Sequence, residues 1–136
     1  MKYLLILITI MLVGVGCGET EPKPLSPEEQ KLVGSYEKPS MVIRNHKLVR
    51  QAGAGKLVLL ENRTIEFYRN GELAEVYGES KWKIVGNEVH FVSNSATEVK
   101  KIEPNGDLTG IANISNQGER YEIHKTAQST FKKVKE

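Results

Sequence analysis

The sequence has a single cysteine, Cys17, and therefore cannot form a disulfide within the chain. It also lacks a block of like charges, because 19 basic and 17 acidic side chains give a formal net charge of +2, which disfavours nucleic acid as a partner. No apolar run reaches the roughly 20 residues that a transmembrane helix needs. With 136 residues, the chain is also too short for a two-domain enzyme.

An apolar segment begins close to the N-terminus. Lys2 precedes 13 residues, Tyr3 to Val15, that are apolar or glycine, and Gly16 and Cys17 follow. This is the length of the hydrophobic region of a signal peptide. Residues 1–16 resemble a bacterial lipoprotein signal, in which a small residue precedes a cysteine that is lipidated on its thiol. The resemblance implies lipidation of Cys17. The alternative is an ordinary secreted protein whose cysteine lies beside the cleavage point by chance.

The resemblance to a lipoprotein also implies where the protein works. Several acyl chains at Cys17 would hold it firmly on a membrane of the cell envelope, whereas one chain binds only marginally. Gly18, rather than Asp, resembles the class sorted to the outer membrane and facing the periplasm, if the bacterium has two membranes. Residues 17–25 are polar and contain Pro22 and Pro24, so they are predicted to form the lipidated N-terminus and a flexible tether.

The remaining residues, 26–136, are predicted to form one small all-β domain. Ser26 as N-cap, Pro27 at the first helical position and Glu29 at the capping-box position predict a short N-terminal helix that ends near Leu32 and plugs one end of the domain. After Gly34, alternating runs are separated by turn residues every eight to ten positions. We expect about nine strands in an antiparallel up-and-down meander, either a small barrel or a strongly curled sheet.

The turns predict the register of two hairpins. Asn-Gly at 70–71 and Gly-Asn at 86–87 are predicted two-residue turns. Each gives a hairpin with one apolar face and one solvent-exposed face. The predicted pairs are Arg69–Glu72, Phe67–Ala74 and Ile65–Val76 in the first hairpin, and Ile84–Val89, Trp82–Phe91 and Lys83–His90 in the second.

The residues that open the first strand suggest a family. Residues 32–36 read LVGSY, and the Gly34-Ser35-Tyr36 triplet resembles the opening of the lipocalin-like (calycin-type) small barrels of bacterial lipoproteins. The segments GESKWKIVGNEVHF and KIEPNGDLTGIA resemble a recurring, uncharacterised domain of bacterial lipoproteins. The resemblance implies a ring at Tyr36 that closes the barrel base, and it raises the alternative function of carrying a small hydrophobic ligand.

The chemistry-bearing residues do not form a recognisable motif. His46, His90 and His124 have no metal-ligand spacing around them, and no serine lies in a nucleophile elbow. We therefore expect no metal, no cofactor and no enzymatic activity, and we take the histidines to be solvated strand residues.

An exposed apolar patch is the remaining candidate site. Tyr68, Leu73 and Tyr77 are predicted to share the outer face of one hairpin as a partner surface; alternatively, a neighbouring strand or the 39–52 loop covers them. The predicted function is non-enzymatic binding of a protein or envelope component, with the barrel interior filled by its own side chains.

Overall fold

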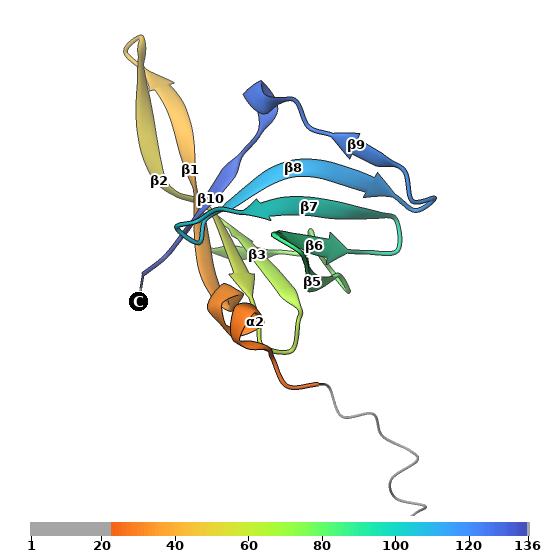
Figure 1. Cartoon of the computed structure of the whole chain (residues 1–136). Coiled ribbons are helices and arrows are strands. Elements are labelled where there is room, and N and C mark those ends of the chain that lie inside the picture. Colours follow the sequence, from red (N-terminus) through yellow and green to blue (C-terminus); the bar gives the residue numbers. More distant parts are fainter. Residues whose placement is uncertain (1–22, 136) are drawn as a thin grey trace, which may run out of the picture.

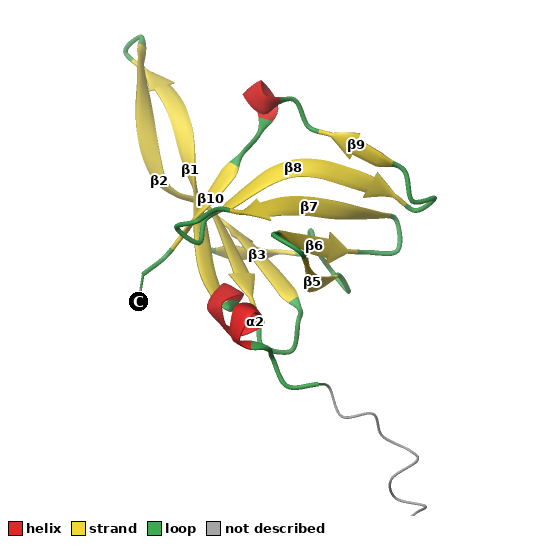
Figure 2. Ribbon diagram, viewed as in Figure 1, coloured by secondary structure: helices red, strands yellow, loops and turns green. Residues whose placement is uncertain are grey.

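The structure, a computed structural model, describes residues 23–135 and consists of one short helix and a curled β-sheet (Figures 1 and 2). The predicted leader, Cys17 and most of the tether lie outside the described residues. The elements in chain order are α2 (Pro27–Leu32), β1 (Gly34–Arg44), β2 (Lys47–Leu59), β3 (Ile65–Arg69), β4 (Glu72–Ala74), β5 (Lys81–Val85), β6 (Glu88–Val92), β7 (Ala96–Ile102), β8 (Leu108–Ser115), β9 (Arg120–Glu122), the 3-10 turn η1 (Lys125–Ala127) and β10 (Thr130–Lys133).

All strand pairs are antiparallel, in the order β4-β3-β2-β1-β10-β8-β7-β6-β5, with β9 also paired to β8. The predicted all-β meander is thus confirmed, and residues 23–135 contain ten strands where about nine were expected. The sheet is not closed, so the curled sheet is the form observed. β4 ends at Ala74, and the isolated bridge between Thr64 and Lys81 is the one strand pairing that residues 23–135 show between the β3 side of the sheet and β5.

The predicted registers are almost entirely correct. Trp82–Phe91, Lys83–His90 and Ile84–Val89 pair as expected, as do Arg69–Glu72 and Phe67–Ala74. The pairing of Ile65 with Val76 is wrong. Ile65 pairs with Leu59 of β2, and Val76 lies beyond the end of β4 with 59% of its surface exposed.

The 39–52 segment is not a loop. β1 and β2 form a long hairpin with a two-residue turn at Asn45 and His46, whose φ values are 53° and 61°. Two successive left-handed residues give a hairpin turn whose twist matches that of the strands. Histidine is an unusual residue for such a turn, so the sequence pattern did not reveal it.

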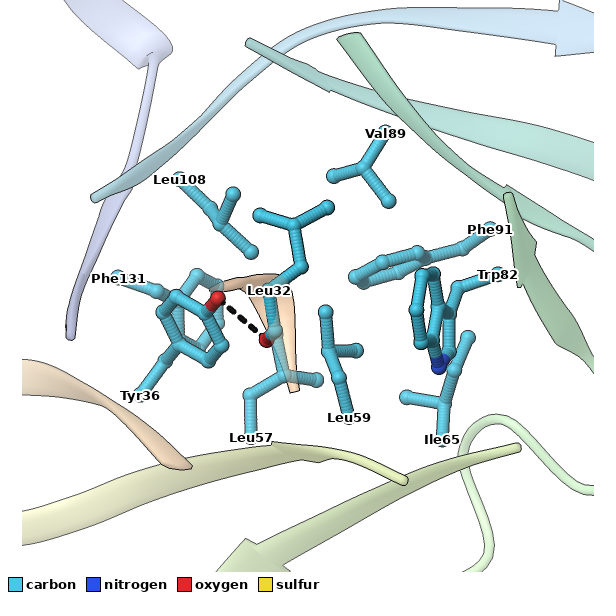
Figure 3. Close-up of a cluster of buried hydrophobic side chains, with 10 residues drawn as sticks. All are labelled: Leu32, Tyr36, Leu57, Leu59, Ile65, Trp82, Val89, Phe91, Leu108 and Phe131. Atoms are coloured by element: carbon cyan, nitrogen blue, oxygen red, sulfur yellow. Dashed lines mark hydrogen bonds between the residues drawn. The ribbon is translucent and has the colours of Figure 1, made fainter. Parts of the chain in front are cut away.

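Helix α2 is built as predicted. The Ser26 hydroxyl accepts a hydrogen bond from the backbone N–H of Glu29, while the Glu29 carboxylate accepts one from the backbone N–H of Ser26. Glu29 also forms an ion pair with Arg63 in the β2–β3 turn, at 2.9 Å. Leu32, in the last turn, inserts into the core (Figure 3). The helix is thereby fastened against the end of the curled sheet where the β2–β3 turn lies.

The core fills the inside of the curl (Figure 3). The Tyr36 hydroxyl donates a hydrogen bond of 2.6 Å to the carbonyl of Leu32, which joins β1 to the helix. Burial raises the pKa of this phenol above its usual range. Burying each large side chain contributes about 1.5–3 kcal/mol. The core side chains are Leu32, Tyr36, Leu57, Leu59, Ile65, Trp82, Val89, Phe91, Leu108 and Phe131.

Candidate functional site

Of the four residues singled out by the sequence, Cys17 lies outside the described residues. Among residues 23–135, no helix is both long enough and apolar enough to span a bilayer.

Tyr68 and Leu73 do share a face. They are cross-strand partners in the β3–β4 hairpin, on the side opposite Phe67 and the core. Leu73 is 57% exposed, whereas Tyr68 is half-buried and donates a hydrogen bond of 2.6 Å to the Glu66 carboxylate. That bond raises the pKa of Tyr68. Leu73 is therefore the exposed apolar contact on this outer face.

Tyr77 does not belong to that face. Its ring packs edge-on against Phe67, at 6.3 Å between centroids, and against Phe91, at 5.5 Å. Both partners lie on the inner face of the sheet. The predicted three-residue surface is thus divided between two faces, because the chain leaves the β3–β4 ladder after Ala74 and residues 75–80 turn back over the edge of the curl.

Tyr77 lies at the end of the curl that α2 does not cover. Because antiparallel neighbours run in opposite directions, the β3–β4, β6–β7 and β8–β9 turns lie at the end opposite the β2–β3 turn and the helix. A surface depression there, which we call the open end, is lined by Glu75, Val76, Tyr77, Gly78, Ser80, Phe91, Ser93, Ser95, Ala96, Glu98 and Asn113.

An ion pair between a buried lysine and a partly exposed glutamate lies on the inner face beside the open end. Lys100 is 2% exposed, and its Nζ lies 2.9 Å from Oε1 of Glu98. The same ammonium lies 5.3 Å from the centroid of the Phe91 ring and 5.0 Å from that of Phe131, distances at which the faces of the rings attract a cation. Phe67 completes the aromatic set, with its ring edge-on to Phe131 at 6.4 Å.

Glu98 connects this pair to the depression. Its side chain is 38% exposed and lines the open end. Burial raises the pKa of the neighbouring Tyr77 phenol, and the Glu98 carboxylate raises it further. The open end therefore combines aromatic rings, hydroxyls and two carboxylates, groups that can hold a ligand with both apolar and polar parts.

Glu98 and Lys100 were missed at the sequence level, although a signal for them exists. The confirmed β5–β6 hairpin places Val89 and Phe91 on the inner face, and these residues pair with Lys100 and Glu98 on β7. Extending the register by one strand would have placed both charges inside the sheet.

A second ionic cluster lies on the other face of the same strands. His90 is 8% exposed, not solvated as expected, and its Nε2 lies 2.9 Å from Oε2 of Glu88. Arg120 binds both oxygens of Glu88, at 2.8 and 3.1 Å, and also contacts Glu122 at 2.6 Å. The hydrogen bonds from Arg120 and then from His90 lower the pKa of Glu88 to about 2.

The other two histidines lie apart from this cluster. His46 is at the tip of the β1–β2 hairpin, and His124 contacts the Thr126 hydroxyl beside η1. Within residues 23–135, His, Asp, Glu and Cys side chains do not gather in threes around a point that could hold a metal ion.

The chain was compared with protein-family models, curated proteins and solved structures, and none of them matches it.

Proposed function

We propose that this chain is a lipid-anchored, non-enzymatic binding domain of a bacterial cell envelope, and that it engages its ligand at the open end. The observation that carries the proposal is the difference between the two ends of the curl. Helix α2 inserts Leu32 into the core at one end, whereas a depression at the other end is lined by Tyr77, Phe91 and Glu98.

Binding is favoured over catalysis because the charged groups nearest the open end are engaged with each other. Lys100 is held by Glu98 and by two aromatic rings. These contacts fix the position of the Lys100 ammonium and the Glu98 carboxylate, and fixed charges of this kind suit recognition of a ligand. The same feature weighs against the alternative of a carrier for a small hydrophobic ligand, because the inner face is occupied by core side chains and by a buried charge.

The anchoring part of the proposal rests on residues 1–18 of the sequence. Lipidation at Cys17 would place the domain on the outer membrane, facing the periplasm, in a two-membrane bacterium. Mass spectrometry of the N-terminal peptide from membrane-extracted protein tests it: a diacylglyceryl group on Cys17 is expected. An unmodified thiol would overturn the anchor without bearing on the open end.

Photo-crosslinking in the native cell tests the open end. A photoreactive amino acid is placed at Ser95 or Val76, which line the depression, or at Asn105 and Lys83 as exposed control positions elsewhere. We expect one defined adduct from Ser95 and Val76 that disappears when Ala96→Arg narrows the opening. Equal crosslinking from Asn105 and Lys83, or no adduct at the open end, would contradict the proposal.

A further inference from the structure

The tip of the β1–β2 hairpin extends away from the rest of the fold. The ladder from β1 to β10 involves Tyr36 and Glu37, and the ladder from β2 to β3 involves Lys56 to Leu59. Residues 40–44 and 47–51 pair only with each other, and we call residues 40–51 the arm. Figure 1 shows the arm projecting at the upper left, clear of the remaining strands. An isolated two-stranded ribbon is only marginally stable in water, so the arm is suited to a partner.

The arm carries an excess of positive charge. Arg44, Lys47 and Arg50 lie within these twelve residues, and residues 38–60 contain no Asp or Glu. The rest of the chain has sixteen basic and seventeen acidic side chains. The net charge of +2 is therefore the sum of a basic arm and a nearly neutral body. This asymmetry selects an anionic partner.

The same twelve residues are rich in aliphatic side chains. Ile43 pairs with Leu48 and Val42 with Val49, directly beside the Arg44–Lys47 pair at the turn. An anionic polymer would use the charges but has no apolar part for these aliphatic residues. Single-stranded nucleic acids are commonly bound by stacking of their bases on aromatic side chains, and residues 40–51 contain no Phe, Tyr or Trp. A lipid bilayer with anionic headgroups accepts both kinds of residue, because acyl chains lie just below its phosphates.

We propose that the arm binds the surface of a bilayer that contains anionic phospholipids. Arg44, Lys47 and Arg50 meet the headgroup phosphates, and the aliphatic residues enter the boundary between headgroups and acyl chains. The arm begins at the end of β1 remote from α2, and Figure 1 shows the turn at 45–46 and the helix at opposite sides of the molecule. The arm is therefore a membrane contact separate from any anchor at Cys17, and neither depends on the other.

The experiment uses residues 23–136, which include every core residue, ion pair and strand pairing described above. This segment has no Cys17 and so no acyl chain. Sedimentation with vesicles of phosphatidylcholine, with and without phosphatidylglycerol, measures binding. We expect binding only to the anionic vesicles, weakened by salt. Each neutralised basic residue is expected to weaken it roughly 5-fold, so Arg44→Gln, Lys47→Gln and Arg50→Gln together weaken it about 100-fold.

The matched control neutralises three exposed lysines outside the arm, Lys83→Gln, Lys125→Gln and Lys135→Gln, with the same change in net charge. Circular dichroism melting verifies that each variant is folded. If both triple variants lose affinity equally, or if the parent segment binds both kinds of vesicle equally, the proposal is overturned.

A second measurement locates the contact and does not depend on removing charges. His46→Cys at the turn or Asn116→Cys in the β8–β9 turn supplies a single thiol for an environment-sensitive dye. We expect a blue shift on anionic vesicles at position 46 only. If the protein binds the vesicles but the emission of the dye at position 46 does not shift, the contact is purely ionic. A soluble polyanion would make such a contact equally well, so this result would overturn insertion into the bilayer.

Discussion

Lys100 and Glu98 form an ion pair on the inner face of β7, two positions apart on one strand, with the ammonium 2.9 Å from the carboxylate. The lysine is almost completely buried and the glutamate is partly exposed. A buried charge that loses its partner costs more than a buried pair replaced by apolar groups. Loss of the Glu98 carboxylate should therefore destabilise the fold more than loss of the Lys100 ammonium.

Substitutions of this pair should show that asymmetry. Glu98→Gln leaves the Lys100 ammonium without a counter-charge and is expected to lower the free energy of unfolding by about 2 kcal/mol. Lys100→Met should cost less, and the double variant should be more stable than Glu98→Gln alone. Urea denaturation of the parent, the two single variants and the double variant measures their free energies of unfolding. A Glu98→Gln variant as stable as the parent would contradict the dependence.

The Glu88–Arg120 pair should make the fold sensitive to acid. The pKa of Glu88 is lowered to about 2 from an ordinary value of 4.5. A carboxyl group whose pKa is lowered by folding stabilises the fold above its unfolded pKa, and this contribution is lost as the pH falls from about 4.5 to 2.

Removal of the arginine isolates that contribution. Arg120→Gln should destabilise the protein at pH 7, and its stability should fall less steeply than that of the parent as the pH is lowered. The control is Arg69→Gln, at an exposed arginine on the tip of β3. Melting temperatures across the acid range provide the readout. Parallel profiles for the parent and Arg120→Gln would show that the pair does not cause the acid sensitivity.

Tyr36→Phe should uncouple β1 from the helix. It removes the hydrogen bond to the Leu32 carbonyl and leaves that acceptor unpaired, at an expected cost of about 1 kcal/mol. The pKa of Tyr36 is raised by folding above its ordinary value of 10.0, so its stabilising contribution is present below that pH and is lost as the pH rises past it. The difference between parent and variant should therefore shrink in alkali. A constant difference in urea midpoint from neutral to alkaline pH would disprove this.

Gly55→Ala should disturb the aromatic packing near the open end. A Cβ at residue 55 would lie 3.3 Å from Cζ of Phe67, whose ring is held between Tyr77 and Phe131. Because the ring has little freedom to move, we expect a loss of about 1 kcal/mol. Lys56→Ala, at the exposed neighbouring position, should change stability by less than about 0.5 kcal/mol. Equal effects of the two substitutions in thermal unfolding would refute this packing argument.

Local sequence signals predicted the local structure well. The Ser26–Glu29 capping box and the two-residue turns at 70–71 and 86–87 act through neighbours a few positions away, and each produced the expected helix or hairpin register. The expectation failed at Val76 because nothing near it in the chain indicates that β4 stops at Ala74.

The residues of the candidate site are placed by contacts with residues far away in the sequence. Tyr77 lies on the inner face because Phe67 and Phe91 lie there, and Lys100 is buried because Glu98 and two rings surround its charge. The balanced charge of the whole chain also concealed the basic arm, whose projection follows from how little of β1 and β2 pairs with β10 and β3.

The sequence by itself determined the helix cap, the all-β class and most hairpin registers, because period-two alternation and turn chemistry operate within a few residues. Only the tertiary structure decided that the sheet stays open, which face receives Tyr77, and that Glu98 and Lys100 are paired inside. These outcomes depend on how the sheet curls and on contacts between strands that are far apart in the sequence. Whether a polar or aromatic side chain is buried there depends on which partners the other strands bring to it.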